Sequence, residues 1–290
     1  MDEVMDPSLV IYGEGFFKGG LILCIFFKIK DTIYGEKNIT LLSNLAQVKR
    51  KNSIVELAVK NSKILNINNY KALNINNIRS FHTKVKASKR IGPHNGDVLS
   101  VLVGSLLGNG YCKKRSVEGT RFCLRQNIIY KEYLFWLYDF FLYRGYCSNL
   151  KPILCTRVLR DKEYFGYEFS IFTFRSLNWL YDLFYHRGKK RITPMLLFYL
   201  TPLALAVWIM DVGEWDEPGV RLPTYNFSSF QVWILLRILF IVYGLNCKAS
   251  ASTKGFKSSI YIKKNSVPKL KIIVSPYMHY SMWHKIGINF

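Results

Sequence analysis

The pattern of hydrophobic and polar positions from residue 92 onward predicts alternating helices and short strands. Apolar residues recur with helical spacing over residues 97–107, 131–143, 177–186, 202–210, 230–243 and 267–277. Runs rich in β-branched and aromatic residues favour strands over residues 120–126, 148–157, 167–174, 219–226, 247–252 and 258–263. Gly145 and Gly188 follow two of the expected helices, as C-terminal glycines often do. The pattern therefore predicts an α+β protein.

The order of these elements occurs twice along the chain. Gly119 and Arg121 correspond to Gly219 and Arg221, at an offset of about a hundred residues that holds throughout the repeat. Each unit has a helix, a strand, a long helix, two strands and a helix, and a second strand is expected in the loop before each long helix. The repeat predicts two αββαββα-like halves, residues 92–194 and residues 195–290.

Residues 1–91 do not follow this repeat. They contain short apolar runs, an Asn- and Ile-rich tract at residues 61–78, and four positive charges between Lys84 and Arg90. We therefore expect an irregular basic N-terminal extension. Its apolar run at residues 20–27 is far shorter than the roughly 20 residues of a membrane-spanning helix, so no membrane helix is expected. Three acids among the first six residues argue against a secretory signal.

The composition points to a polyanionic partner. The formal net charge is +22, with 41 Lys and Arg against 19 Asp and Glu. Such a balance favours nucleic acid, because each neutralised phosphate releases counterions, although a basic chain can also reflect solubility or its compartment. Half of the residues are hydrophobic, which excludes a disordered chain. The six cysteines and five histidines show no zinc-site spacing, so we expect reduced thiols and no zinc hydrolase.

Two apolar stretches that end in glycine open the two units. They are Leu102-Val-Gly-Ser-Leu-Leu-Gly-Asn-Gly110 and Leu205-Ala-Val-Trp-Ile-Met-Asp-Val-Gly213. Both resemble the signature helix of LAGLIDADG homing endonucleases and intron maturases, and the resemblance extends over about residues 92–290. It implies a pseudo-dimeric fold with two saddle-shaped antiparallel sheets and the two signature helices side by side. Small residues allow close helix packing, so the expected contact residues are Gly104, Gly108, Ala206 and Gly213.

The resemblance also locates the catalytic positions. In the family, the residue before the final glycine is an acid that binds the catalytic metal, and these positions are Asn109 and Val212. Mg²⁺ prefers carboxylate oxygens, whereas an amide offers one neutral oxygen and valine offers none. Asp211 lies one helical step of about 100° away, and Glu214 follows the helix. No intact catalytic acid and no bound metal are expected, with Mg²⁺ as cofactor only if cleavage persists through Asp211 or Glu214.

Basic residues of the predicted strands are the expected nucleic-acid contacts. Arg121 and Arg125 are four residues apart, so both side chains lie on one face of a strand. The resemblance implies that the two sheets track phosphates and base edges, as β-ribbons can. The candidates are Lys113, Lys114, Arg115, Arg121, Arg125, Arg157, Arg175, Arg221, Lys248, Lys263 and Lys264. The basic turn at residues 187–191 is interpreted as a solvated loop instead.

The missing acids favour a nucleic-acid-binding protein that does not cut, acting as an intron RNA maturase or another RNA-binding factor. One alternative is an active homing endonuclease that cuts double-stranded DNA with Mg²⁺. Others are a structural RNA-binding component of a ribonucleoprotein and a decaying reading frame. The expected partner is intron or ribosomal RNA or double-stranded DNA, and no membrane. The protein is expected to be a monomer with internal pseudo-twofold symmetry, alone or within a ribonucleoprotein. Heavy use of Asn, Ile, Lys, Tyr and Phe, typical of AT-rich organellar genomes, adds the expectation of the mitochondrial matrix.

Overall fold

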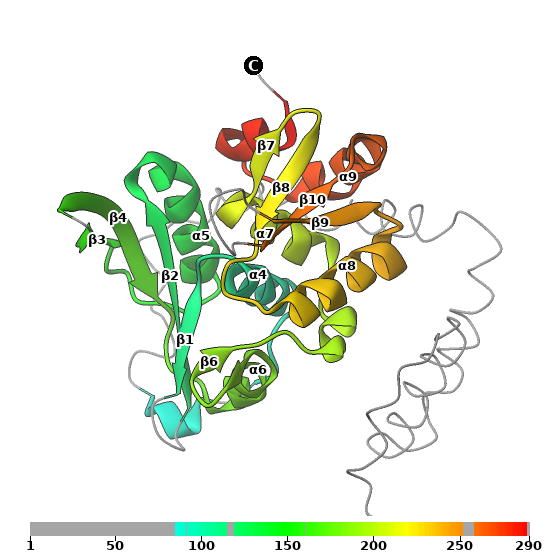
Figure 1. Cartoon of the computed structure of the whole chain (residues 1–290). Coiled ribbons are helices and arrows are strands. Elements are labelled where there is room, and N and C mark those ends of the chain that lie inside the picture. The colour runs from blue at the N-terminus through cyan, green and yellow to red at the C-terminus, as the bar shows by residue number, and fades with distance from the viewer. Residues whose placement is uncertain (1–84, 91, 115–118, 160, 252–257, 289–290) are drawn as a thin grey trace, which may run out of the picture. The chain divides into compact units, whose positions relative to one another are not determined.

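The computed structural model describes residues 85–90, 92–114, 119–159, 161–251 and 258–288 (Figure 1). Contacts divide the chain into two units, Met1–Leu57 and Ala58–Phe290, and the second unit contains every described helix and strand. Both predicted halves therefore belong to one unit. Of the predicted N-terminal extension, only residues 85–90 are described, with the short 3-10 helix η6 (Ala87–Lys89).

The first half contains a four-stranded antiparallel sheet with the order β1-β2-β4-β3. Its elements are α4 (Gly96–Leu107), β1 (Tyr111–Lys114), β2 (Thr120–Asn127), α5 (Lys131–Tyr143), β3 (Ile153–Leu159), β4 (Lys162–Ser170), α6 (Asn178–Phe184), β5 (Tyr185–His186) and β6 (Lys189–Lys190). Helix α5 packs against β2 and β4, and its apolar face supplies the fully buried Tyr133 and Phe141. The opposite face of the sheet carries the ion pair between Arg125 of β2 and Glu168 of β4.

The second half repeats this arrangement with the sheet order β7-β8-β10-β9. Its elements are η9 (Pro194–Phe198), α7 (Pro202–Val212), β7 (Glu214–Asp216), β8 (Gly219–Pro223), α8 (Ser229–Tyr243), β9 (Cys247–Ala251), β10 (Ser258–Ile262), α9 (Val267–Val274) and η12 (Tyr280–Ile286). Strands β1 and β7 are the second strands that were expected before the long helices. The predicted α+β fold with two αββαββα-like halves is confirmed. The predicted boundary between residues 194 and 195 falls at the start of η9.

The β3–β4 hairpin differs from the prediction of strands at residues 148–157 and 167–174. Strand β3 ends and strand β4 begins at a tight turn that contains Asp161, whose φ of 58° lies in the left-handed region. This turn sets the register of the hairpin, and an aspartate tolerates such a backbone conformation better than most residues. Ile171 and Phe174 lie beyond the end of β4 and are also buried. The run of hydrophobic residues therefore extends past the strand, and hydrophobicity alone locates neither the strand nor the turn before it.

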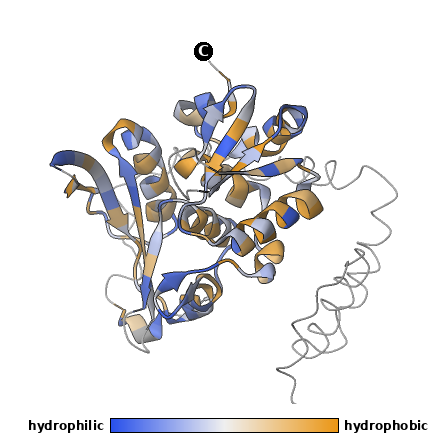
Figure 2. Cartoon of the chain, viewed as in Figure 1, coloured by the Kyte–Doolittle hydropathy of each residue, from blue (hydrophilic) through white to orange (hydrophobic). Residues whose placement is uncertain are grey.

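Helices α4 and α7 lie side by side at the centre of the core, and the fully buried Trp208 belongs to α7. Helix α8 begins with a capping box of Ser228 and Gln231 and ends at Gly244, whose φ of 60° is left-handed. Figure 2 shows hydrophobic residues along most of α8. Among the described residues, no helix combines the length and hydrophobicity needed to cross a membrane.

Candidate nucleic-acid interface

The two signature helices approach each other through glycines. A Cβ atom on Gly104 would lie 2.7 Å from the Val207 Cβ and even closer to the Ala204 carbonyl oxygen. A Cβ atom on Gly108 would lie 2.6 Å from Asp211 Oδ2. Gly104 and Gly108 therefore lie at the contact between α4 and α7, as the sequence predicts, and neither position has room for a side chain.

The second helix contributes other residues than those predicted. Ala204, Val207 and Asp211 face the two glycines, whereas Ala206 is buried but makes none of these close approaches. Gly213 caps its own helix, because its N–H donates to the Ile209 carbonyl and a Cβ there would meet the same oxygen. The helical period explains the difference, since positions 204, 207 and 211 recur on one face while position 206 points elsewhere.

The two acid positions carry no carboxylate in the folded protein. Asn109 donates from Nδ2 to the Asp211 carbonyl oxygen at 3.1 Å and to Gln126 Oε1 at 3.3 Å. Val212 is half-buried at the end of α7 and has no polar side-chain atom. Since the Asn109 amide already bonds to the protein, this pair of residues does not fit the ligand set of a divalent metal.

Asp211 belongs to the second half, and its buried carboxylate accepts hydrogen bonds from three residues of the first half. Its Oδ1 accepts hydrogen bonds from Tyr133 Oη at 2.8 Å and Gln126 Nε2 at 2.9 Å, and its Oδ2 accepts one from the Asn109 N–H at 3.3 Å. These donors all belong to the first half. Gly108 occupies the corresponding position of the first motif, so the glycine of one helix leaves space for the carboxylate of the other. Burial raises the pKa of Asp211 to about 6, and the hydrogen bond from Tyr133 and the charge of Lys285 oppose that rise.

Two lysines, the buried Lys285 and the half-buried Lys190, bind the C-terminal ends of the signature helices. Lys190 Nζ donates to the carbonyls of Leu106 at 2.8 Å and Gly110 at 2.6 Å, and Lys285 Nζ donates to that of Met210 at 2.6 Å. A cation there is favourable because helix C-termini carry partial negative charge. Burial lowers the pKa of both lysines to about 8, and the Asp211 carboxylate opposes the shift.

The interpretation of residues 187–191 as a solvated loop is wrong for Lys190, which lies in β6, is half-buried and donates to main-chain carbonyls. The sequence analysis also missed Lys285, Gln126 and Tyr133, none of which stands in a recognisable motif. One signal was available, because the separation of Lys190 and Lys285 is close to the repeat offset of roughly a hundred residues. Matching lysines in two repeated units are candidates for a shared role.

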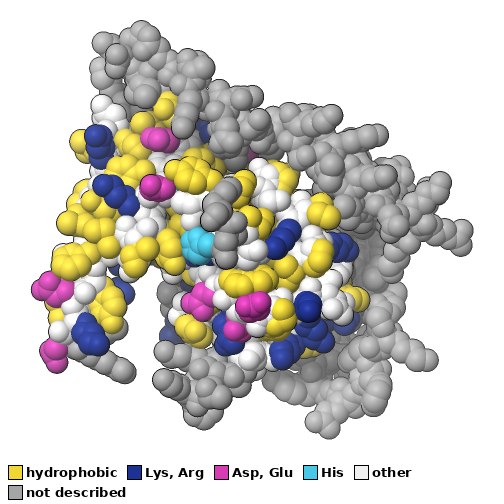
Figure 3. Space-filling model, turned by 90° about the horizontal axis from the view of Figure 1, so that it is seen from above, with side chains coloured by type: hydrophobic (Ala, Val, Ile, Leu, Met, Phe, Trp, Pro, Cys, Tyr) yellow, Lys and Arg dark blue, Asp and Glu magenta, His cyan; other side chains and the backbone are white. Residues whose placement is uncertain are grey.

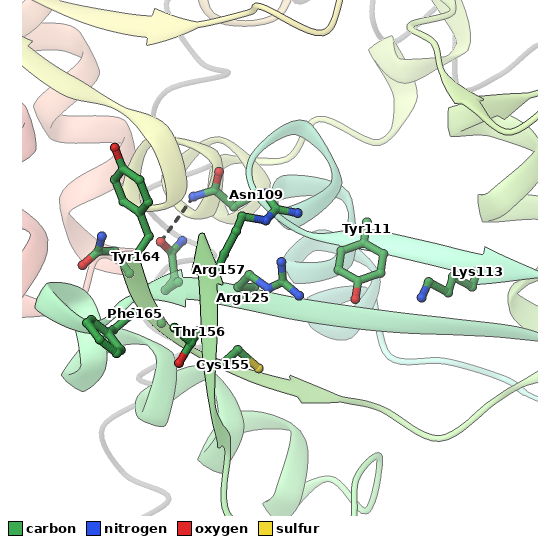
Figure 4. A pocket seen from close by; sticks show the side chains of 12 residues that line it. Asn109, Tyr111, Lys113, Arg125, Cys155, Thr156, Arg157, Tyr164 and Phe165 are labelled. Carbon is green, nitrogen blue, oxygen red and sulfur yellow. Dashed lines mark hydrogen bonds between the residues drawn. The ribbon is translucent and has the colours of Figure 1, made fainter. Parts of the chain in front are cut away.

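One face of the first sheet brings most of the predicted basic residues of that half together. In the antiparallel register Lys113 lies opposite Arg121, and residues directly opposite share a face. Arg125 lies opposite Glu168, and Arg157 lies opposite Tyr164. These strands border a hollow of about 860 Å³ (Figure 4). Its lining includes Asn109, Tyr111, Lys113, Arg125, Arg157 and Tyr164.

The second sheet has a smaller set of basic residues on the same face. Arg221 lies opposite both Glu214 and Tyr261, and Tyr261 lies opposite Lys248. Arg221 forms an ion pair with Asp216, with its Nε 3.0 Å from Oδ2. Figure 3 shows one side of the molecule, on which Lys and Arg side chains lie in separate groups among hydrophobic ones.

Each sheet therefore has one arginine that is already neutralised. In the first sheet this is Arg125, which forms an ion pair with Glu168. Within the described residues, Arg121, Arg157, Lys113 and Lys248 form no ion pair. Sequence spacing could not show this distinction, because the partner acids lie on neighbouring strands.

The other predicted basic residues do not lie on these faces of the strands. Lys114 alternates with Lys113, and its side chain lies 3.2 Å from Asp182 of α6. Arg175 begins the 3-10 helix η8 (Arg175–Leu177), because β4 ends earlier than predicted. Lys263 follows β10, and Lys264 begins η10 (Lys264–Ser266). The remaining candidate, Arg115, lies outside the described residues.

Comparison with known proteins identifies relatives of similar sequence. Cytochrome b mRNA maturase bI2 of Saccharomyces cerevisiae is 34% identical over 240 residues, which cover 79% of this chain and 53% of that protein. Intron-encoded endonuclease ai4 of Dictyostelium discoideum is 38% identical over 158 residues, or 53% of this chain and 99% of that protein. The chain therefore spans about half the length of the yeast maturase.

A solved structure agrees with these relatives. The homing endonuclease I-WcaI bound to its DNA recognition sequence matches with a TM-score of 0.62 and 25% identity, over 70% of this chain and 92% of that one. Residues 99–270 match the sequence model of the LAGLIDADG DNA endonuclease family, a range that begins within α4 and includes α7 and both four-stranded sheets. The chain belongs to the LAGLIDADG DNA endonuclease family.

Proposed function

We propose that this chain is a LAGLIDADG-family nucleic-acid-binding protein that does not cut its target and acts as a maturase on intron RNA. The observation that carries the proposal is the centre of the molecule. Both family acid positions are neutral, as Asn109 and Val212, and the nearest carboxylate, Asp211, is held by three hydrogen bonds from the first half.

Loss of cleavage follows from the chemistry of this centre. Metal-assisted phosphodiester hydrolysis needs carboxylates to hold the ions that activate water and stabilise the leaving oxygen. The side chains at the two positions do not fit such ions, because neither Asn109 nor Val212 carries a carboxylate. Moving Asp211 into that role would leave Tyr133 and Gln126 without their acceptor inside the core.

Binding is supported by the sheets and by the charge of the chain. Arg121, Arg157, Lys113 and Lys248 are available for phosphates on the sheet faces, and the net charge of +22 favours any polyanion. The relatives with similar sequences are named as mRNA maturases and as an intron-encoded endonuclease, and the absence of both acids favours the maturase role. The composition and these names support a mitochondrial matrix location. There the protein acts as a monomer with internal pseudo-twofold symmetry, alone or within a ribonucleoprotein.

The test combines binding, splicing and cleavage. Purified protein is titrated with the host intron RNA over a range of salt concentrations, and splicing of that RNA is followed with and without protein. The duplex that spans the intronless exon junction is incubated with protein and Mg²⁺ or Mn²⁺. We expect salt-dependent RNA binding, faster splicing and no double-strand breaks. Efficient metal-dependent breaks would establish the endonuclease alternative instead, and equal affinity for every RNA would favour a structural ribonucleoprotein role.

A further inference from the structure

The two sheets differ in the contacts of one tyrosine on each, Tyr261 in the second sheet and Tyr164 in the first. In the second sheet, Tyr261 lies against the strand, because its ring atoms would come within 2.6 Å of a Cβ on Gly219 and its hydroxyl donates to the Asp216 carbonyl. In the first sheet, Tyr164 is 47% exposed. Among the described residues it has no hydrogen-bond or ring partner, so its aromatic face is available to a ligand.

The register places an open floor beside Tyr164. Along β4 the next residue on the same face is Gly166, which lies opposite Cys155 on β3 and Asn127 on β2. Glycine contributes no side chain here, and the Gln126 carbonyl approaches it so closely that a Cβ would lie 2.6 Å away. Gly166 and Cys155 both line the hollow of about 860 Å³ at this point, and the glycine leaves space beside the Tyr164 ring.

One cationic group lies beside the free ring, because Arg157 on β3 is directly opposite Tyr164. Lys113 lines the other end of the hollow, where its Nζ lies 5.4 Å from the centroid of the Tyr111 ring. A free aromatic ring beside a cation that forms no ion pair is an arrangement by which proteins bind single strands, with bases stacked on the ring and phosphates near the cation. The hollow is within the usual size range of sites that enclose a small aromatic group.

Only an unpaired base can stack on the exposed ring of Tyr164. In a duplex, each base is stacked between its neighbours and presents only its edges in the grooves. An unpaired base in a loop or bulge exposes its flat face and can stack on an aromatic side chain. We propose that Tyr164 stacks on an unpaired base of the bound RNA, with Arg157 at the adjacent phosphate. This inference rests on the proposed nucleic-acid binding and specifies the form of RNA that the first sheet takes.

The experiment uses a short single-stranded RNA with one adenine replaced by the fluorescent analogue 2-aminopurine, and the same strand annealed to its complement. Full-length protein is compared with the variants Tyr164→Leu and Tyr164→Phe. We expect Tyr164→Leu to weaken single-strand binding about 5- to 100-fold, the range of one lost base stack, and to abolish the fluorescence quenching. Tyr164→Phe keeps the ring and should bind as the unmodified protein does. Binding of the duplex should change little in either variant.

The controls separate this inference from the proposed function. Phe198→Leu removes another exposed aromatic ring, 56% exposed on η9, which packs against α8 on the helix side. It should leave single-strand binding unchanged, and equal melting temperatures show that the variants fold. Salt-dependent binding that Tyr164→Leu leaves intact, or an equal loss for single strand and duplex, would overturn the stacking role while leaving nucleic-acid binding in place. If the unmodified protein binds neither probe, the proposed function fails, and the stacking role fails with it.

Discussion

The two halves share their strand order and helix packing, but their nucleic-acid faces and their central residues differ. The first half contributes Gly108 to the middle of the molecule, and the second contributes Asp211 at the matching position. On the sheets, Tyr164 is free beside an open hollow, whereas Tyr261 covers Gly219. A repeated scaffold therefore holds two unlike surfaces.

The two halves share one further feature, a lysine that donates hydrogen bonds to the C-terminal end of each signature helix. Each helix ends at a lysine that binds main-chain carbonyls, the half-buried Lys190 in the first half and the buried Lys285 in the second. These contacts do not depend on the acids that the family uses for cleavage. The scaffold can therefore persist after the catalytic positions change.

The largest effect is expected from filling the shared helix contact. Gly104→Leu would drive a side chain into the Ala204 carbonyl and Val207, and overpacking of this kind costs about 3 kcal/mol or more when backbone must move. Urea unfolding should show this loss or a chain that no longer folds. The matched control is Gly96→Leu in the same helix, where a Cβ meets nothing within 4 Å. Gly119 is unsuitable as a control, since its φ of 154° and the Phe174 backbone at 2.8 Å exclude a side chain. Equal melting temperatures for the two leucine variants would contradict the helix pair.

Substitution of Asp211 should give the next largest loss of stability, because its carboxylate belongs to the second half and its hydrogen-bond donors belong to the first. Asp211→Asn replaces one acceptor oxygen with an NH₂ group that faces either the Asn109 N–H or the donors of Tyr133 and Gln126. A buried donor left without an acceptor costs roughly 1–3 kcal/mol. We expect a loss of this order at neutral pH in chemical denaturation. Tyr133→Phe removes only one hydrogen bond and should cost about 1 kcal/mol.

The pH dependence of this loss has a defined sign. The pKa of Asp211 is raised from 3.8 to about 6 in the folded protein, so the folded state binds the proton more tightly than the unfolded state does. Its contribution to stability is therefore greatest below pH 4 and falls by roughly 1–3 kcal/mol as pH rises to 6. The difference in unfolding free energy between the unmodified protein and Asp211→Asn should shrink across that interval. A difference that is constant with pH would show that Asp211 has an ordinary pKa.

Restoring the two family acids tests, by a cleavage assay, whether the neutral residues at positions 109 and 212 are what prevents cleavage. Asn109→Asp together with Val212→Asp should yield slow metal-dependent nicking or cleavage where the unmodified chain has none. The rate should stay low, because the carboxylate introduced at position 109 would face the Asp211 carbonyl oxygen and lose the bonds of the amide. Plasmid cleavage with Mn²⁺ measures the gain, and the single variants are the controls. Cleavage by the unmodified protein at the same rate would mean that other residues hold the metal.

The sequence predicts regular elements well where local pattern decides them. Helix α5 has the bounds that were predicted, and the two glycines of α4 lie at the helix contact, because helical period and small size are readable locally. The strands of the β3–β4 hairpin were misplaced because a turn at Asp161 sets their register. Lys190, Lys285 and the Arg125–Glu168 pair were not predicted as such. Each depends on segments that are distant in the sequence and meet only after folding.

The smallest effect, and the sharpest test of how the sheets differ, concerns salt. Arg121→Gln with Arg157→Gln removes two cations that form no ion pair, so the slope of log affinity against log salt should flatten by about one unit per lost phosphate contact. Arg125→Gln with Glu168→Gln also removes two side chains but leaves the net charge unchanged. Its slope should match that of the unmodified protein. Lys248→Gln should flatten the slope by about one unit through the second sheet, because nucleic acid that spans both halves contacts phosphates on each. A slope that responds to Lys248 alone would restrict the interface to the second half, and one that responds to the paired arginine would show that Glu168 releases Arg125 on binding.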